Sequence, residues 1–124
     1  MKKILVVEDD VGICNVCLRV LTGEGFDVDC ATSGKVAEYM IEEKQYDLCL
    51  IDIRTSKMGG TELYQWLQKK YPQLTGGVIF TTGDVMGGDT KSFLEQSGRP
   101  FLPKPFTPDE LKNIVQEALM QMGK

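Results

Sequence analysis

Short apolar runs alternate along the chain with longer stretches in which apolar residues recur every three or four positions. The runs are rich in β-branched residues and predict strands, whereas the periodic stretches predict helices. The stretch between residues 83 and 98 is rich in glycine and predicts only one short helix, around Phe93 and Leu94. The five predicted strands cover residues 3–7, 27–31, 47–52, 78–82 and 100–102.

Two of the predicted helices carry clear end signals. The first is followed by Gly23 and Gly25, which are suitable residues for a helix C-terminus. The last opens with Thr107 and Pro108, and Glu110 stands three residues after the threonine. This is the pattern of a capping box, so we expect the helix to begin there.

The alternation of five strands with helices predicts a parallel sheet covered by helices on both faces, with right-handed crossovers. Five such units favour the flavodoxin-like (βα)5 three-layer sandwich with the strand order 2-1-3-4-5. In that order the ligand crevice lies between the carboxyl ends of the first and third strands. The length of 124 residues suits a single domain covering residues 1–124.

Composition and charge exclude several classes of function. The net charge of −4 and the isoelectric point near 4.8 argue against direct nucleic-acid binding. No apolar run approaches the ~20 residues of a membrane span, and the first apolar run is too short for a signal peptide, so we expect a cytoplasmic protein. The chain has no histidine, which removes the usual Ser/His and Cys/His catalytic pairs.

The four cysteines are interpreted as reduced thiols that serve as small hydrophobic residues. Cys14 and Cys17 form a C-x-x-C motif, but the motif falls on a predicted helix and not where a strand or loop meets a helix start. Cys30 and Cys49 lie in predicted strands. A zinc site needs a second pair of closely spaced ligands, and the sequence has none.

Carboxylates gather where the first and third predicted strands end. Glu8, Asp9 and Asp10 follow the first strand, and the third ends on Asp52. Two carboxylates repel each other by about 4 kcal/mol at a separation of ~4 Å and an effective dielectric constant of about 20. A bound cation relieves this repulsion, and a set of oxygen ligands with room for water favours Mg²⁺ or Mn²⁺.

The fourth and fifth predicted strands add a hydroxyl group and an ammonium group. The fourth ends on Thr81 and Thr82, and Lys104 follows the fifth. A cation, an ammonium group and a hydroxyl group can together neutralise the oxygens of a phosphoryl group in transfer. A carboxylate such as Asp52 can be the nucleophile of that transfer and form an aspartyl phosphate.

Over almost its whole length the sequence resembles the receiver domains of two-component response regulators. The matching motifs are Glu8–Asp9, Asp52, Thr82 with the small Gly83, and Lys104–Pro105–Phe106. The intervals of 30 residues from Asp52 to Thr82 and of 22 residues from Thr82 to Lys104 are those of the family. Thr81 fits neither interval, so the resemblance selects Thr82.

The resemblance implies a role for each acidic residue. Asp52 is expected to accept a phosphoryl group from a histidine kinase or a phosphotransfer domain. Mg²⁺ is expected to be held by Asp9, by Asp52, by Glu8 through water and by the backbone carbonyl of Arg54. Phosphorylation is then expected to change a surface that binds a downstream protein.

The resemblance also implies two switch residues and a backbone feature. Thr82 is expected to bind the new phosphoryl oxygen, and Lys104 to pair with Asp52 before transfer and with the phosphoryl group afterwards. Phe101 occupies the aromatic switch position of the family. The alternative is that Phe101 is an ordinary residue of the hydrophobic core. The bond between Lys104 and Pro105 is expected to be cis.

The first predicted helix carries the face that meets the phosphodonor in receivers. We expect its sheet-facing residues to be Ile13, Val16, Cys17 and Val20. The more exposed face then carries Val11, Cys14, Asn15 and Leu18. These residues form either a docking surface for the phosphodonor or only scattered surface hydrophobic residues.

Some features of the chain leave alternatives open. Residues 98–106 resemble receivers fused to hybrid sensor kinases, whereas residues 1–4 resemble the start of a single-domain regulator. Ser56 stands where the family usually has proline. Arg54 and Asp84 have opposite charges and could pair across the site or remain two separate surface charges.

The leading hypothesis is a phosphorylation-driven signalling switch, with self-catalysed phosphoryl transfer and slow autodephosphorylation but no turnover of other substrates. A degenerate receiver that acts as a phosphorylation-independent binding module is one alternative, although Asp52 and Lys104 are both present. A small phosphohydrolase on the same fold is another. It would need a second carboxylate two residues after the nucleophile, where Arg54 stands.

Overall fold

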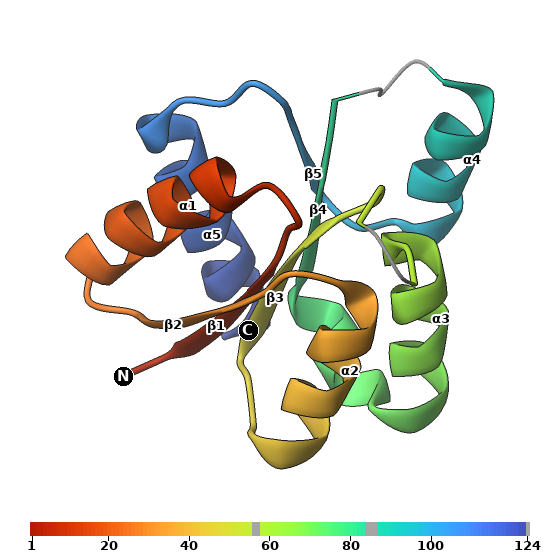
Figure 1. Ribbon diagram of the computed structural model, residues 1–124, viewed down its shortest axis with the longest axis horizontal. Helices are drawn as coiled ribbons and strands as arrows, with labels where there is room; N and C mark the ends of the chain where they lie inside the picture. The colour runs from red at the N-terminus through yellow and green to blue at the C-terminus, as the bar shows by residue number, and fades with distance from the viewer. Residues whose placement is uncertain (56–57, 84–86, 124) are drawn as a thin grey trace.

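The strands of the protein form one parallel sheet in the order β2-β1-β3-β4-β5 (Figure 1), which confirms the predicted topology. The computed structural model describes residues 1–55, 58–83 and 87–123. The last strand is shifted by one residue from the predicted range. The strands are β1 (Lys3–Val7), β2 (Asp27–Ala31), β3 (Leu48–Asp52), β4 (Val78–Thr82) and β5 (Phe101–Pro103).

Helices cover both faces of the sheet (Figure 1). They are α1 (Val11–Gly23), α2 (Gly34–Glu43), α3 (Gly60–Lys70), the 3-10 helix η1 (Pro72–Gly77), α4 (Gly88–Ser97) and α5 (Pro108–Met122). α1 and α5 lie on one face, and α2, α3 and α4 lie on the other (Figure 1). Among the residues that the structure describes, no helix has both the length and the apolar character needed to cross a membrane.

The two faces of the sheet carry two separate hydrophobic cores, because successive side chains of a strand point to opposite sides. On β1, Ile4 and Val6 pack in the core beneath α1 and α5, whereas Leu5 and Val7 pack in the core beneath α2 and α3. β3 lies in the middle of the sheet and all five of its residues are buried. The continuous apolar run that ends on Asp52 therefore reflects a strand covered on both faces.

The helix expected around Phe93 and Leu94 is α4, which is longer than its weak pattern indicates. Only Thr90 and Leu94 of this helix are buried, so an apolar stripe is hardly visible in the sequence. Phe93 anchors the helix through edge-to-face contacts with Phe80 and Tyr64, at ring-centroid distances of 5.1 and 5.9 Å. The 3-10 helix that follows α3 was not predicted from the sequence.

Polar side chains cap the amino ends of three helices. The side chain of Asp10 accepts a hydrogen bond from the backbone of Ile13 at the start of α1, and Ser33 caps α2 in the same way. Thr107 and Glu110 form the expected capping box of α5. Since Asp10 is committed to the start of α1, the acidic residues beside it are the ones available to a ligand.

Two groups of side-chain hydrogen bonds lie at the periphery of the sheet. The guanidinium group of Arg99 donates to the carbonyls of Val78 (2.9 Å) and Gly76 (2.8 Å) at the amino end of β4. On the edge strand β2, Asp29 accepts hydrogen bonds from the hydroxyl of Tyr46 (2.8 Å) and from Lys44 (3.2 Å). Burial raises the pKa of Asp29, but these two hydrogen bonds more than offset it and leave the pKa below its usual value.

Candidate functional site

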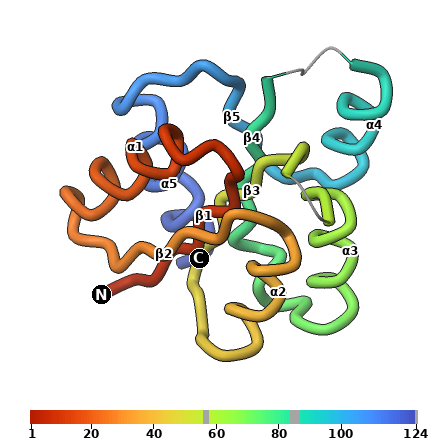
Figure 2. The backbone as a smooth tube through the Cα atoms, in the orientation of Figure 1, coloured from red at the N-terminus to blue at the C-terminus, as the bar shows by residue number. Residues whose placement is uncertain are grey.

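The carboxyl ends of β1, β3 and β4 meet at one edge of the sheet (Figure 2). Val7 pairs with Ile51 in the register of β1 and β3, so Glu8 and Asp52 occupy corresponding positions just beyond that pair. Asp52 in turn lies opposite Thr81 of β4. The sheet register alone therefore brings together acidic residues that are 44 positions apart in the sequence.

The two carboxylates at this edge are deeply buried. The Glu8 residue is 2% exposed and Asp52 is 5% exposed. The backbone N–H of Arg54 donates to Oδ1 of Asp52 (3.1 Å), and the backbone N–H of Asp10 donates to Oε2 of Glu8 (3.2 Å). Burial and the neighbouring Asp52 charge raise the pKa of Glu8, although its contacts with Lys104 and Asp10 act in the opposite direction.

Lys104 bridges the two buried carboxylates. Its Nζ lies 2.7 Å from Oε1 of Glu8 and 3.0 Å from Oδ2 of Asp52. Burial lowers the pKa of Lys104, but the two hydrogen bonds more than offset that effect and the pKa is raised overall. The backbone N–H of Lys104 also donates to the carbonyl of Thr82 (2.8 Å), which ties the lysine to the end of β4. The Lys104–Pro105 peptide bond is cis, as expected.

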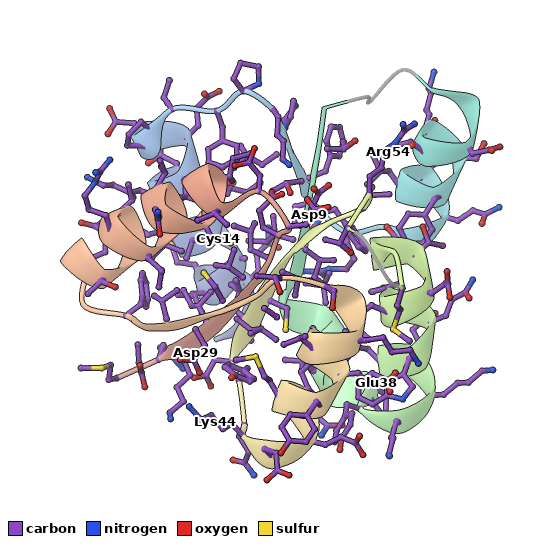
Figure 3. All side chains as sticks on the ribbon, viewed as in Figure 1. Asp9, Cys14, Asp29, Glu38, Lys44 and Arg54 are labelled. Atoms are coloured by element: carbon purple, nitrogen blue, oxygen red, sulfur yellow. The ribbon has the colours of Figure 1, made fainter. Side chains whose placement is uncertain are left out.

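The donor set suits a hard divalent cation. Carboxylate oxygens of Glu8, Asp9 and Asp52 all lie within 4.8 Å of one another. Asp9 is exposed and supplies the side of the cluster that is open to solvent. Asp9 and Arg54 lie at the same edge of the sheet (Figure 3). An all-oxygen set with one open side fits Mg²⁺, which keeps several of its waters when bound.

The two threonines at the end of β4 are both almost fully buried, Thr81 at 3% and Thr82 at 1% exposure. Thr81 pairs with Asp52 of β3, and Thr82 pairs with Pro103 of β5. Burial alone therefore does not distinguish them, and the choice of Thr82 rests on the spacing of the motifs. Ser56 and Asp84 lie outside the residues that the structure describes.

Phe101 does not lie in the core. It is 41% exposed on β5, where it pairs with Phe80 of β4. Plain core packing is thus the weaker of the two interpretations of this aromatic residue. An exposed aromatic side chain on the strand next to Thr82 is available to a partner protein.

The expected docking face of α1 needs one correction. Cys14 was placed among the exposed residues, but it is 5% exposed and lies between α1 and the sheet (Figure 3). The buried residues of α1 are Cys14, Cys17 and Leu21, and Ile13 and Val20 pack against the same core as expected, so the buried side of the helix is broader than predicted. Val11 is 63% exposed. Asn15 is exposed and Leu18 is half-buried, so these two remain on the outer side of the helix.

A shallow apolar pocket of about 440 Å³ lies beside this helix. Its walls come from the start of α1 and from the segment after β5. The residues that line it are Asp10, Gly12, Ile13, Val16, Lys104, Pro105 and Phe106. The pocket thus lies next to Lys104 of the acidic cluster.

The loop after Asp52 is held by contacts that sequence analysis did not find. The hydroxyl of the buried Thr55 donates to the carbonyl of Met58 (3.1 Å), and Met58 has a φ of 78°. A Cβ added at Gly34 would overlap the same carbonyl of Met58. A Cβ added at Gly60 would lie only 2.8 Å from the carbonyl oxygen of Asp52. These two glycines allow the loop to pack closely against the start of α2 and the end of β3.

A comparison with family models matches residues 4–116 to the response regulator receiver domain. The chain therefore belongs to the receiver domain family of two-component response regulators, whose members are signalling modules. This result confirms the resemblance seen in the motifs.

Individual relatives agree with this assignment. The chain is 30% identical over 118 residues to the transcriptional regulatory protein GlrR of Escherichia coli. The aligned region covers 95% of this chain and 26% of GlrR. The chain is also 30% identical over 109 residues to the transcriptional regulatory protein TctD of Salmonella typhimurium, covering 88% of this chain and 48% of TctD. The chain thus spans about a quarter to a half of the length of these curated relatives.

One solved structure matches the fold over nearly the whole length of both chains. The response regulator receiver domain protein (CheY-like) from Methanospirillum hungatei is 29% identical and superposes with a TM-score of 0.89, covering 99% of this chain and 97% of that one.

Proposed function

We propose that Asp52 accepts a phosphoryl group from a phosphohistidine of a histidine kinase or a phosphotransfer domain. The observation that carries this proposal is the contact of Lys104 with both Asp52 and Glu8 in a pocket where both carboxylates are buried. A carboxylate in contact with an ammonium group and beside two further acidic ligands has the surroundings that phosphoryl transfer requires.

In this transfer an oxygen of Asp52 attacks phosphorus, a new P–O bond forms and the P–N bond to the donor imidazole breaks. The imidazole leaves with the electron pair of that bond. The backbone N–H of Arg54 orients Oδ1 of Asp52. Lys104 exchanges its contact with Asp52 for one with a phosphoryl oxygen, and the hydroxyl of Thr82 binds another.

We propose Mg²⁺ as the cofactor of the site. Asp9, Asp52 and the backbone carbonyl of Arg54 would hold it directly, and Glu8 through water. When bound, the ion supplies positive charge that balances the carboxylates and the incoming phosphoryl oxygens. The spacing of the Glu8, Asp9 and Asp52 oxygens and the open side at Asp9 support this assignment.

The surfaces on either side of the site are proposed to meet two partners. The donor docks on the outer side of α1, at Val11, Asn15 and Leu18. The downstream protein binds the β4–β5 side, where the exposed Phe101 responds to the contact of Thr82 with the phosphoryl group. Phosphorylation adds charge and hydrogen-bond acceptors at Asp52 and thereby shifts this surface between two states.

We propose that residues 1–124 act as one receiver domain in the cytoplasm. Its only reactions are self-catalysed phosphoryl gain and slow hydrolysis of the aspartyl phosphate. Direct nucleic-acid binding is not part of the proposal, because the chain has a net charge of −4. GlrR and TctD are transcriptional regulatory proteins, but both are much longer than this chain.

The test is to incubate the protein with Mg²⁺ and a small acyl phosphate and to measure its intact mass. We expect the gain of one phosphoryl group, no gain in Asp52→Asn and a full gain in the matched control Asp47→Asn. A wild-type protein that remains unmodified, although folded, would contradict the proposal and favour a phosphorylation-independent binding module. Many turnovers of a phosphomonoester would instead favour a phosphohydrolase.

A further inference from the structure

Three of the four cysteines gather where α1 packs on the sheet. Cys14 and Cys17 project from the buried side of α1, and Cys30 lies on β2. Cys49 is on β3 and belongs to the core on the opposite face of the sheet from Cys17. All four thiols are free. The cysteines of the cluster therefore come from two different elements, a helix and a strand.

Cys14 and Cys30 form the closest pair of the cluster that crosses between elements. Their side chains lie close enough for each thiol to affect the pKa of the other. The Sγ of Cys30 also lies 3.8 Å from the carbonyl oxygen of Cys14. Because a disulfide requires two side chains that approach from suitable backbone positions, the close approach of Cys30 to the backbone of Cys14 favours this pair.

The two thiols differ in access. Cys30 is half-buried on β2, which is the edge strand of the sheet and has a strand neighbour on one side only. Cys14 is 5% exposed and lies behind it under α1. A small reagent can therefore reach Cys30 from the sheet edge, and Cys14 can then react with the group attached to Cys30.

We propose that Cys14 and Cys30 are a reversible dithiol site that low-molecular-weight disulfides oxidise to an intramolecular disulfide. The Cys30 thiolate attacks one sulfur of the reagent, forms a mixed disulfide and releases one small thiol. The Cys14 thiolate then attacks Sγ of Cys30 and releases the second small thiol. The two cysteine protons are taken up by the two released thiolates, so the protein loses two hydrogen atoms and the reagent gains them.

This pair is connected to the acidic pocket. The Sγ–H of Cys14 donates to the backbone carbonyl of Glu8 (3.1 Å), and the side chain of Glu8 contacts Lys104. Oxidation removes the hydrogen from this thiol and so removes the hydrogen bond. The structure therefore joins the oxidation state of the thiols to the backbone of a residue in the pocket, and the site itself does not depend on the proposed phosphoryl transfer.

The test is to equilibrate the native protein in buffers with different ratios of oxidised to reduced glutathione, block free thiols and digest with trypsin. Burial raises the pKa of the Cys30 thiol to about 12, so exchange is slow and the measurement is made at equilibrium. Cleavage after Lys3, Arg19 and Lys35 places Cys14 and Cys17 together in peptide 4–19 and Cys30 in peptide 20–35. Cys49 falls in peptide 45–54.

We expect a disulfide between peptides 4–19 and 20–35 that forms in oxidising buffer and disappears on reduction. It should persist in Cys17→Ser, where Cys14 is the one cysteine left in peptide 4–19, and in the matched control Cys49→Ser. It should be lost in Cys30→Ser.

Three results would overturn the proposal. One is a protein whose four thiols all stay reduced in the most oxidising buffer. Another is a mixed disulfide at Cys30 that does not proceed further. The third is loss of the cross-link in Cys17→Ser, which would assign the bond to Cys17. Each of these readouts is a covalent mass, so the result is independent of whether Asp52 accepts a phosphoryl group.

Discussion

Lys104 donates from Nζ to Oδ2 of Asp52 over 3.0 Å, across 52 positions of sequence. The contact joins the end of β3, in the middle of the sheet, to the segment that follows the edge strand β5. The same ammonium group lies 2.7 Å from Glu8 at the end of β1. One side chain thus holds three strands together at the edge where the proposed reaction takes place.

Replacing Lys104 by methionine should destabilise the protein in the absence of Mg²⁺. The change keeps the aliphatic stem but leaves the side chains of Glu8 and Asp52, 3% and 7% exposed, without their cation. Loss of one partner from a fully buried ion pair costs about 3–5 kcal/mol. Since the Lys104 side chain is 19% exposed, we expect a smaller loss of about 2 kcal/mol. Urea denaturation in a chelating buffer measures this free energy of unfolding.

The matched control for this change is Lys91→Met, which alters an exposed lysine of α4. It should change the free energy of unfolding by less than about 0.5 kcal/mol. Saturating Mg²⁺ should restore part of the stability lost in Lys104→Met, because the cation replaces the missing positive charge. Equal stability of Lys104→Met and the wild type in the chelating buffer would argue against a structural role of the ammonium group.

Asp9 and Asp10 should respond differently to neutralisation, although they are adjacent. A cation that binds only the folded protein stabilises it by about 1.4 kcal/mol at ten times its dissociation constant. Asp9→Asn removes one of the three proposed acidic ligands and should abolish most of this Mg²⁺-dependent gain. Asp10→Asn should keep the gain, because asparagine caps a helix as well as aspartate does. Thermal unfolding with and without Mg²⁺ distinguishes the two variants, and an Asp9→Asn protein that responds like the wild type would exclude Asp9 as a ligand.

Gly60→Ala tests how closely the loop after Asp52 must pack. The new Cβ would lie 2.7 Å from Cα of Ile53 and 2.8 Å from the carbonyl oxygen of Asp52, so the backbone on one side must move. We expect a loss of about 1–3 kcal/mol in the free energy of unfolding and slower phosphoryl gain from an acyl phosphate. Gly23→Ala is the control, since a Cβ there meets no atom of the described residues within 4 Å. Similar stability of the two variants would show that this close approach is unimportant.

Tyr46→Phe should produce a stability difference that depends on pH. The hydroxyl of Tyr46 donates to Asp29 and helps to hold the pKa of that carboxyl below its ordinary value of 3.8. A carboxyl with a lowered pKa in the folded state contributes stability above pH 3.8, and this contribution is lost as the pH falls through the folded value. We therefore expect a loss of about 1 kcal/mol near pH 7 that shrinks at lower pH. Urea denaturation at several pH values measures it, with Tyr39→Phe, at an exposed tyrosine of α2, as the control. A loss that stays constant below pH 3.8 would contradict the ionic origin of the effect.

The positions of Asp52 and Lys104 could be predicted from the sequence because parallel strands share one edge for all their carboxyl ends. Once the five apolar runs were ordered as 2-1-3-4-5, the residues after them had to converge. The sheet order and the contacts of Lys104 agree with that prediction. Local pattern was sufficient here because the order of parallel strands alone decides which strand ends are neighbours.

The extent of the buried side of α1 could not be predicted in the same way. Apolar residues surround most of this helix, so its pattern does not define where the buried side ends: Ile13 and Val20 pack against the core as expected, but Cys14 is buried as well. The packing of Gly34 against Met58 is equally absent from local pattern, since it joins residues from separate elements. Such contacts depend on the distance between elements, which hydrophobic periodicity does not contain.

The two hydrogen bonds from Arg99 to the carbonyls of Val78 and Gly76 make β4 an asymmetric element. A planar cation clamps its amino end, whereas its carboxyl end carries Thr82, whose carbonyl accepts the backbone N–H of Lys104. In the proposed switch, a movement of Thr82 would act on Lys104 and on β5, where Thr82 pairs with Pro103, while the bonds to Arg99 hold the other end of β4.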